Sequence, residues 1–390
     1  MGGTVSDAWG TSRQSRLFPG PWLVHADLHN HTILSDGSGD PADAFASMRA
    51  AGLDVAALTD HSRWATVTFG LMGLPGMAGI DRGDWETTGR LAEEADDPGE
   101  FVAMRGFEWS SATHGHANVW GSDRFTDPLR TGLLRIGPFW RWLDRKSPDS
   151  LAGFNHAGSS ALRFGGFQHH PSVAERVVSF EIFNKLDDHL LVGTERDRPS
   201  ALVECLDAGW KVGLLGVTDE HGANWGIPEG KGRAGLYVRE LSRAGVFEAL
   251  AARRFFASRV KGLRLDAALN GTRMGRTVPH RGGPAQVTLD LDKAGWTGRE
   301  LSVQVLRPGK GMPTLALAVD VRVPGPDEPV VAFDVELDPA EGAWVVLRVT
   351  DPAGPADPRA TGEWAGLGRA VAYSSPFWLS GREAASGEGR

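Results

Sequence analysis

Two histidines separated by one residue, His29 and His31, follow a short apolar run near the N-terminus. The run Trp22 to Val24 predicts a β-strand, and side chains two residues apart on a strand point to the same face. The segment Asp36-Gly37-Ser38-Gly39 predicts a loop that can turn a carboxylate back toward the imidazoles. In isolation the pair would equally suit a polar patch, but with this loop it predicts a metal site at the C-terminal end of a strand.

The composition narrows the class of protein and the ligands available. At 390 residues the chain is long enough for two domains and a sizeable core. The formal net charge is −8 and no basic run or stripe is present, which argues against nucleic-acid binding and favours a small-molecule substrate. The single cysteine, Cys205, excludes an intramolecular disulfide framework and a cysteine-rich zinc module. Metal ligands must therefore be histidines and carboxylates.

Targeting signals are also lacking. No segment has the charged start and apolar core of a signal peptide, and no apolar stretch reaches membrane-spanning length. We therefore expect a cytoplasmic protein with neither a membrane nor a nucleic acid as its partner. Chain length does not force self-association, so a homo-oligomer stays open.

The first two thirds of the chain alternate strand-like runs with helical patterns, and eleven of the twelve histidines lie at or before His221. One helix is predicted with Asp40 as its N-cap, Pro41 in its first turn and Gly52 at its end, before a strand over 54–59. Two further helices, around 85–95 and over 200–208, precede strands over 101–107 and 211–217. This alternation predicts a parallel α/β sheet or barrel.

After residue 262 the pattern changes to alternating strands separated by Gly, Pro, Asn and Asp turns. Asn270-Gly271 predicts a hairpin, and an antiparallel β-sandwich is expected. The predicted strands span 263–269, 286–291, 301–306, 330–337 and 344–349. The expected division of the chain is a flexible N-terminal lead over 1–20, a barrel over 21–262, a β-sandwich over 263–380 and a disordered tail over 381–390.

Further histidines and carboxylates stand at or near the ends of the predicted strands. They are Asp60, His61, Glu108, His116, His156, Asp219 and His221. Neutral imidazoles and carboxylates suit zinc, manganese or iron, and no thiolate narrows the choice among these metals.

In this order the motifs resemble the PHP (polymerase and histidinol phosphatase) superfamily. The motifs are Asp27-Leu28-His29-Asn30-His31-Thr32 with Ser35-Asp36-Gly37, then Thr59-Asp60-His61, Glu108, Gly115-His116, Asn155-His156 and Asp219-Glu220-His221. Segments 107–109, 115–121, 155–158, 181–184 and 224–226, together with the β-rich C-terminal region, resemble the CehA/McbA-type metallohydrolase branch. The resemblance covers roughly residues 22–379, and several ordered motifs carry it.

The resemblance implies a distorted (β/α)7 barrel, followed by the sandwich, that holds two or three divalent metal ions. One metal would be bound by His29, His31, Glu108 and Asp219, a second by Glu108, His116 and His156, and a third by Asp36, His61 and His221. Glu108 would bridge the first two. The Gly-His-x-Asn match favours His116 over His114 as the ligand. Asp27 and Asp60 are placed to hold the second nitrogen of a metal-binding imidazole.

Two metals that share a water can hold it as hydroxide and neutralise charge on a phosphoryl or carbonyl oxygen. We expect in-line hydrolysis of a small-molecule phosphate mono- or diester. Glu108, Asp219 and His221 are the expected catalytic residues, and His221 or a metal-bound water would assist the leaving oxygen. Candidate cations for holding the phosphate are Arg63, Arg163 and Lys185.

Two further interpretations stay open. The same hydroxide could attack a carbamate, ester or amide carbonyl, as the resemblance to the carbaryl-hydrolase branch implies. An apolar substrate pocket would then be walled by Trp64, Phe69, Trp109, Trp120, Trp140 and Trp225. In the last interpretation, the chain is a non-catalytic metal-dependent binding domain whose β-sandwich is the interaction surface. Because no expected ligand is lost, an enzyme is favoured over a binding domain.

Overall fold

Local sequence signals set the first α-helix of the described residues. In the computed structural model, which describes residues 13–62, 64–65, 77–131, 135–226 and 229–381, helix α2 (Pro41–Ala50) begins at Asp40. The Asp40 side chain accepts a hydrogen bond from the Ala42 N–H, and Pro41 occupies the first turn, where a missing N–H costs nothing. Gly52 follows with a φ of 85°, which an L side chain rarely adopts. The predicted helix is confirmed.

Strands and helices alternate through the first two thirds of the chain. The strands are β1 (Trp22–Asp27), β2 (Val55–Leu58), β3 (Trp64–Ala65), β4 (Met77–Ala78), β5 (Val102–Ser111), β6 (Gly115–Trp120), β7 (Leu151–Asn155), β8 (Val177–Asn184), β9 (Asp187–Asp188), β10 (Gly213–Val217), β11 (Arg233–Val238) and β12 (Phe255–Ser258). The α-helices after α2 are α3 (Arg82–Ala95), α4 (Pro128–Thr131), α5 (Gly137–Lys146), α6 (Arg163–Gly166), α7 (Ala201–Asp207) and α8 (Arg243–Ala251). Short 3-10 turns are η2 (Ala157–Ser159) and η3 (Thr194–Arg196).

The sheet of this region is mixed, which corrects the expectation of a parallel one. Its strands run in the order β10-β8-β7-β6-β5-β2-β1-β11-β12. Neighbours are parallel for β10/β8, β8/β7, β5/β2 and β2/β1, but antiparallel for β7/β6, β6/β5, β1/β11 and β11/β12. Strand periodicity indicates which side chains share a face but not the direction of the neighbouring strand. The seven-unit barrel implied by the resemblance stays a prediction.

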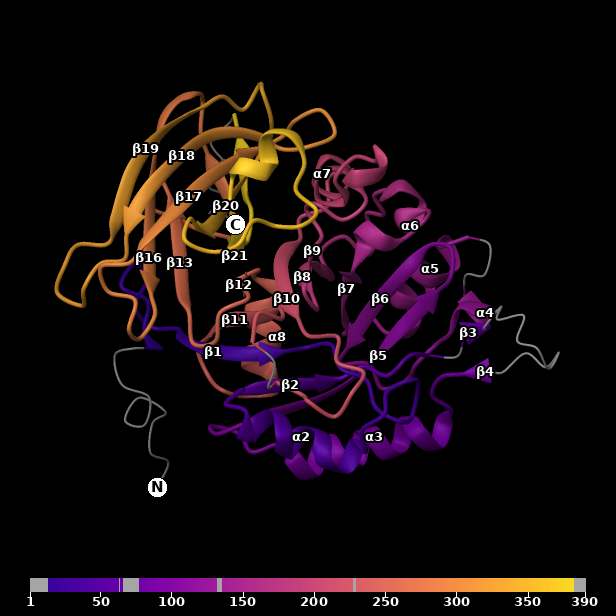
Figure 1. Ribbon diagram of the computed structural model, residues 1–390. Helices are drawn as coiled ribbons and strands as arrows, with labels where there is room; N and C mark the ends of the chain where they lie inside the picture. The colour runs from indigo at the N-terminus through magenta and orange to yellow at the C-terminus, as the bar shows by residue number, and fades with distance from the viewer. Residues whose placement is uncertain (1–12, 63, 66–76, 132–134, 227–228, 382–390) are drawn as a thin grey trace, which may run out of the picture.

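Helices α2 and α3 lie side by side along one face of β2 and β5 (Figure 1). Their apolar residues, including Phe45, Met48 and Ala92, pack on Leu58 and Phe101 in one buried cluster. Helix α3 begins with a reciprocal capping box between Asp81 and Asp84, which fixes its first turn. These helices therefore support the strands whose ends carry part of the candidate site.

The C-terminal region is built of strands with antiparallel pairing predominating, and Asn270 and Gly271 turn the predicted hairpin with φ of 49° and 73°. The strands are β13 (Arg264–Leu269), β14 (Thr272–Arg273), β15 (Thr277–Pro279), β16 (Gly283–Asp292), β17 (Glu300–Arg307), β18 (Thr314–Arg322), β19 (Val331–Leu337), β20 (Trp344–Asp351), β21 (Arg369–Ser374) and β22 (Phe377–Ser380), with a 3-10 turn η4 (Gly362–Gly366). Five predicted strands are confirmed, whereas β18 and β21 and the shorter β14, β15 and β22 were not predicted.

Two sheets face each other across an apolar core in this region. One has the order β14-β13-β16-β19, and the other continues the large sheet through β12-β21-β20-β17-β18. Leu289 on the first and Val303 and Leu347 on the second belong to the same buried cluster. Because β12 pairs with both β11 and β21, hydrogen bonding runs across the expected boundary at residue 262. That boundary stays a prediction.

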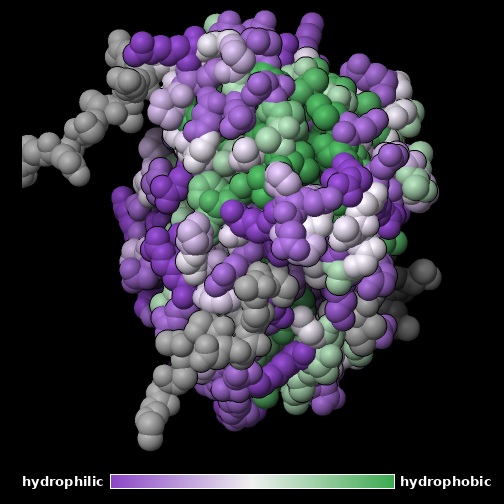
Figure 2. Space-filling view, turned by 90° about the vertical axis from the view of Figure 1, so that its left-hand side faces the viewer, coloured by the Kyte–Doolittle hydropathy of each residue, from purple (hydrophilic) through white to green (hydrophobic). Residues whose placement is uncertain are grey.

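The edges of these two sheets leave apolar side chains partly exposed. Strands β18 and β19 each end their sheet, and Leu317 and Val319 on β18 and Phe333 on β19 are half-buried against the core. Figure 2 shows the side of the molecule where the C-terminal strands lie, and apolar side chains gather among charged ones over its upper part.

Two residues of the expected N-terminal lead contact the folded chain. Arg13 Nη1 lies 2.7 Å from Asp54 Oδ2, and the Arg16 N–H donates a hydrogen bond of 2.9 Å to Asp290 Oδ2. Arg13 and Arg16 are therefore tied to the folded chain. Residues 1–12 of the expected lead lie outside the described residues, as do 382–390 of the expected tail, and the flexible lead stays a prediction. None of the described helices is long and apolar enough to cross a membrane.

The fold brings the ends of several strands to one place. His29 and His31 follow β1, His61 follows β2, His156 follows β7, and Asp219 follows β10. Isolated bridges link Asn30 to Glu220 and His61 to Glu108, so the loops after β1 and β10 lie beside each other and the loop after β2 lies beside β5. The sheet therefore assembles the candidate site from segments distant in sequence.

Candidate metal centre

Nine side chains that the sequence predicts as ligands converge in one cluster. They come from strands β5 and β6 and from the loops after β1, β2, β7 and β10: His29, His31, Asp36, His61, Glu108, His116, His156, Asp219 and His221. Within three groups the ligand atoms all lie within 4.8 Å of one another: His31, Asp36, His61 and His221; His29, His31 and Asp219; and His61, Glu108 and His116. His31 and His61 each belong to two of these groups.

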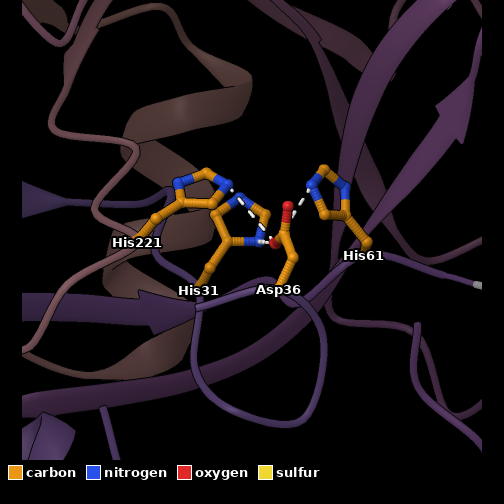
Figure 3. Close-up of side chains that lie close together, drawn as sticks. All are labelled: His31, Asp36, His61 and His221. Carbon is orange, nitrogen blue, oxygen red and sulfur yellow. Dashed lines mark ion pairs between the residues drawn. The ribbon is translucent and has the colours of Figure 1, made fainter. Parts of the chain in front are cut away.

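The Asp36 carboxylate lies between three imidazoles (Figure 3). Its Oδ1 is 3.4 Å from His221 Nε2, 3.5 Å from His61 Nε2 and 3.9 Å from His31 Nδ1. The turn that carries it is tight at Gly37, where an added Cβ would lie 2.8 Å from a backbone nitrogen. The predicted return of a carboxylate toward the histidines is confirmed. The Asp36 and His221 side chains are 32% and 29% exposed, so this group lies on the open side of the cluster.

Glu108 is the centre of the cluster and is fully buried. Its Oε1 lies 3.2–3.3 Å from ring nitrogens of His29, His116 and His156, and its Oε2 lies 2.5 Å from His61 Nδ1. Strand β5 continues to Ser111, so Glu108 lies inside the strand and not at its end as expected. Strand β6 pairs antiparallel with both β5 and β7 and brings His116 close to Glu108, and Asn155 at the end of β7 donates a hydrogen bond to Glu108 Oε1.

Two observations fit these side chains to metal binding. His29 Nε2 and His31 Nε2 face each other at 3.0 Å, an arrangement in which two ring nitrogens point at a common position. Glu108 Oε2 and Asp219 Oδ1 are buried and lack a hydrogen bond of normal geometry within the described residues, although imidazole nitrogens lie close to both. Buried polar atoms normally have a hydrogen-bond partner, so these oxygens are suited to ligating a cation.

The close contacts in the cluster lower the pKa values of Glu108 and Asp219 and raise that of the His61 imidazole. Burial alone raises the pKa of Glu108, but neighbouring imidazoles, His61 first, hold that pKa well below its usual range. The pKa of Asp219 is lowered in the same way against the effect of burial. Burial lowers the pKa of His61, yet Glu108 and Asp36 outweigh it and raise the pKa to about 10. Without metal, the cluster therefore holds ionised carboxylates and a proton on His61.

Asp27 and Asp60 do not hold imidazoles as expected. Asp27 accepts hydrogen bonds from the Thr218 N–H and hydroxyl, which ties the end of β1 to the end of β10. Asp60 accepts from the Thr32 N–H at 2.7 Å and from the Ser35 hydroxyl at 2.6 Å, which fixes the turn leading to Asp36. Both carboxylates therefore anchor the loops that carry ligands.

Glu181 on β8 is a site residue that the sequence analysis did not identify. Its Oε1 lies 2.7 Å from His29 Nδ1, while its Oε2 accepts hydrogen bonds from the His156 N–H at 3.0 Å and from the Asn184 amide at 2.9 Å. A proton on His29 Nδ1 leaves Nε2 free to ligate. The signal was a single carboxylate inside the otherwise uncharged strand Val177–Asn184, all of which is buried.

Two of the expected ligands have unusual backbone conformations. His156 has a φ of 29° and Asp219 a φ of 46°, in the region that favours glycine. Such residues cost of order 1 kcal/mol and gather at functional sites, where the surrounding structure holds them in place. The hydrogen bond from the His156 N–H to Glu181 is one such restraint.

Of the three cations expected to hold the phosphate, one lies beside the metal cluster. Lys185 Nζ lies 3.3 Å from Asp219 Oδ2, and its side chain is 46% exposed beside the cluster. Arg163 is buried, and its Nη1 contacts Glu204 Oε2 at 2.5 Å and the Pro199 carbonyl oxygen at 2.6 Å. These contacts give Arg163 a structural role and not the expected one. Arg63 lies outside the described residues.

The two histidines of β6 and its preceding turn have different surroundings. His116 belongs to the cluster, as the Gly-His-x-Asn match predicts, whereas His114 Nδ1 lies 3.0 Å from the Thr113 hydroxyl.

The aromatic side chains expected around an apolar substrate pocket are buried where they can be described. Trp109, Trp120, Trp140 and Trp225 are at most 2% exposed and pack in the cores instead of lining an open pocket. Phe69 and the Trp64 side chain lie outside the described residues.

One family model matches part of the sequence. A family model described as a protein of unknown function (DUF3604) matches residues 43–124, which include His61, Glu108 and His116. No curated protein matches the sequence.

Among solved structures, the chain is similar to a two-domain protein containing a predicted PHP-like metal-dependent phosphoesterase from Bacteroides vulgatus. The identity is 17%, the TM-score is 0.46, and 85% of this chain and 92% of that chain are covered. It is also similar to PsfC from Pseudomonas syringae, with 14% identity, a TM-score of 0.32 and coverage of 55% and 82%. An amidohydrolase from Chromobacterium violaceum matches at 13% identity with a TM-score of 0.28 and coverage of 50% and 87%. Function must therefore be inferred from the residues of the cluster itself.

Proposed function

We propose that this chain is a metal-dependent hydrolase of the PHP type that cleaves small-molecule phosphate mono- or diesters. The observation that carries the proposal is the convergence of six histidines and three carboxylates, with the buried Glu108 at their centre. Asp36 and His221 leave one side of this cluster open to a substrate.

Two or three divalent ions held by these ligands would supply Lewis acidity that activates water and neutralises charge on the reacting oxygen. Zinc, manganese and iron all suit the ligand set. The residues themselves divide the remaining work. His221 Nδ1 lies 2.9 Å from the Asp219 carbonyl oxygen, which leaves Nε2 on the open side of the cluster. With three ions bound this nitrogen would be a ligand, and with two ions bound it would transfer a proton to the leaving oxygen.

Lys185 supports the choice of a phosphate substrate. Its ammonium is 3.3 Å from Asp219 and partly exposed, so it can contact an anion bound beside the cluster. A lysine acts as a point charge toward phosphate oxygens. A neutral carbamate or amide would gain little from this charge.

One observation favours carbonyl hydrolysis instead. Ile33, two residues after His31, is 56% exposed, and Leu186, directly after Lys185, is 55% exposed. Exposed apolar side chains beside the cluster suit a substrate with an apolar group. A carbamate, ester or amide hydrolase using the same ligands is therefore the second candidate.

The two candidates are separated by turnover on matched chromogenic substrates. Metal-free protein is assayed with a nitrophenyl phosphate monoester, a phosphate diester and a nitrophenyl carbamate, before and after adding zinc, manganese or anaerobic iron(II). We expect metal-restored cleavage of the phosphate esters. Cleavage of the carbamate alone would instead establish carbonyl chemistry.

Two variants test the assigned residues. Glu108→Gln should abolish turnover while the far-ultraviolet circular dichroism spectrum stays unchanged. Lys185→Gln should raise KM for the phosphate monoester about tenfold, which corresponds to about 1.4 kcal/mol of binding free energy. The exposed Lys146→Gln is the matched control and should leave KM unchanged. An equal KM in the Lys185→Gln and wild-type proteins would remove Lys185 from the substrate site.

A further inference from the structure

A cavity lies where β1 and β11 meet the C-terminal strands. It encloses about 340 Å³, which is within the range of sites for small ligands. The residues that carry charge or a ring nitrogen into it are Arg13, His25, Arg233, Lys261, Arg264 and Lys293, with the single acid Asp292. None of the nine residues of the metal cluster lines it, so the cavity is a separate site.

Its charge distinguishes this cavity from four others on the described part of the chain. It is lined by five cationic side chains and one acidic one. Two cavities along α3 have equal numbers, three of each sign in one and four of each in the other. A fourth cavity has one cation and three acids, and a fifth has two of each. On a chain with 41 cationic and 49 acidic residues, this excess of positive charge is local.

Neighbouring acids neutralise only part of this charge. Arg13 Nη1 pairs with Asp54 at 2.7 Å, and Arg264 pairs with Asp290 at 2.9 Å and Asp292 at 3.1 Å. Lys261 and Lys293 form no ion pair with the described residues, and the Lys293 ammonium has only a 3.5 Å contact with the Ala294 carbonyl oxygen. Two lysine charges therefore remain available to a ligand.

His25 lines the cavity, and burial and the neighbouring cations lower the pKa of its imidazole. Burial, and then Arg13, Arg233, Lys261 and Lys293, lower the pKa of its imidazole to about 3. The ring is therefore neutral at physiological pH and carries one N–H donor. A neutral donor among cations adds a directed hydrogen bond to an anion without adding a further charge.

We propose that this cavity binds a small anion through a phosphate group, as free phosphate or as a phosphate monoester. Arginine guanidinium groups and lysine ammonium groups are the side chains that proteins use to hold phosphate oxygens. The site is distinct from the proposed catalytic cluster and does not depend on its activity. His25 lies on β1 and His29 lies two residues beyond the end of that strand, so β1 connects the anion site to the metal site.

Binding is tested on the full chain stripped of metal in the presence of a chelator, so that bound metals cannot hold the phosphate. Isothermal titration calorimetry is performed with inorganic phosphate and, separately, with glycerol phosphate. The wild-type protein is compared with the double variant Lys261→Gln/Lys293→Gln. The matched control is the double variant Lys146→Gln/Lys310→Gln, which removes the same charge at other exposed positions.

We expect saturable binding to the wild-type protein that weakens at least tenfold in the Lys261→Gln/Lys293→Gln variant and changes less than twofold in the control. Binding of both ligands would show that the phosphate group suffices, and binding of glycerol phosphate alone would identify an ester as the ligand. The proposal is overturned if neither ligand binds. It is also overturned if both double variants bind as the wild type does while Lys185→Gln abolishes binding, because the metal cluster would then be the phosphate site.

Discussion

At the scale of single residues, Glu181 connects two parts of the cluster. One oxygen contacts the His29 ring and the other accepts the backbone N–H of His156, whose φ is 29°. The charge of this carboxylate therefore restrains both an imidazole and a strained backbone. A side chain of the same shape without the charge should weaken both restraints.

We predict that Glu181→Gln weakens metal binding ten- to a hundredfold, the usual cost of losing a partner of a metal-binding histidine. Competition with a chromophoric chelator measures the affinity without a substrate. The exposed Glu100→Gln is the control for loss of one negative charge. Equal affinities in the two variants would contradict the role given to Glu181.

A second residue-scale prediction concerns pH. The pKa of His61 in the metal-free protein is raised to about 10, so at pH 7 this ring carries a proton that a metal must displace. Metal affinity should therefore rise as pH rises toward 10, by up to tenfold per pH unit for each proton released. Calorimetry with manganese between pH 6 and 8.5, in buffers of different ionisation enthalpy, counts the protons. Binding without proton release would refute the prediction.

At the scale of elements, close packing between β5 and its neighbours holds Glu108 in place. A Cβ added at Gly106, two residues before Glu108, would lie 2.8 Å from the Val119 carbonyl oxygen and 2.9 Å from Thr59 Cγ2. Neither the strand nor the buried threonine can move freely. Gly106 therefore lets β6 and the end of β2 approach the strand that carries Glu108.

We predict that Gly106→Ala destabilises the fold by about 1–3 kcal/mol, the usual cost of overpacking. It should also weaken metal binding, because the displaced strand carries Glu108. Urea unfolding and chelator competition measure the two effects. Gly366→Ala is the control, since an added Cβ there meets no atom within 4 Å. The same stability for both variants would mean that the strands adjust without cost.

Elements with a local signal could be predicted from the sequence, whereas pairing between distant segments could not. Asp40 and Pro41 start α2, and Asn270-Gly271 turns a hairpin, because these residues act through their own backbone. The antiparallel placement of β6 depends on partners elsewhere in the chain, so no local pattern revealed it. Most of the expected ligands follow strands within short motifs that can be recognised locally, whereas Glu181 lies inside a buried strand with no such motif around it.

At the scale of the whole molecule, the two expected domains share both hydrogen bonds and core. Strand β12 pairs with β11 on one side and β21 on the other. Leu23, Tyr237 and Phe256 of the first region belong to the same buried cluster as Leu289 and other residues of the C-terminal sheets. Separating the regions would expose these side chains to water.

We predict that the full chain unfolds in one cooperative transition. Residues 1–262 alone should show no cooperative unfolding transition. Differential scanning calorimetry tests this through the ratio of van't Hoff to calorimetric enthalpy, which is close to one for a two-state transition. The metal-free protein is used so that bound ions do not change the result. Two separate transitions in the full chain would show that the regions fold independently.

The wide spacing of the ligands also affects how the protein is made. The cluster draws on segments from His29 to His221, and the loops that carry them depend on strands that are synthesised later. Strand β1 is held by β11, and β12 is held by β21, which ends at Ser374. A ribosome must therefore have released most of the chain before any ion finds its full set of ligands, so metal loading follows translation instead of guiding it.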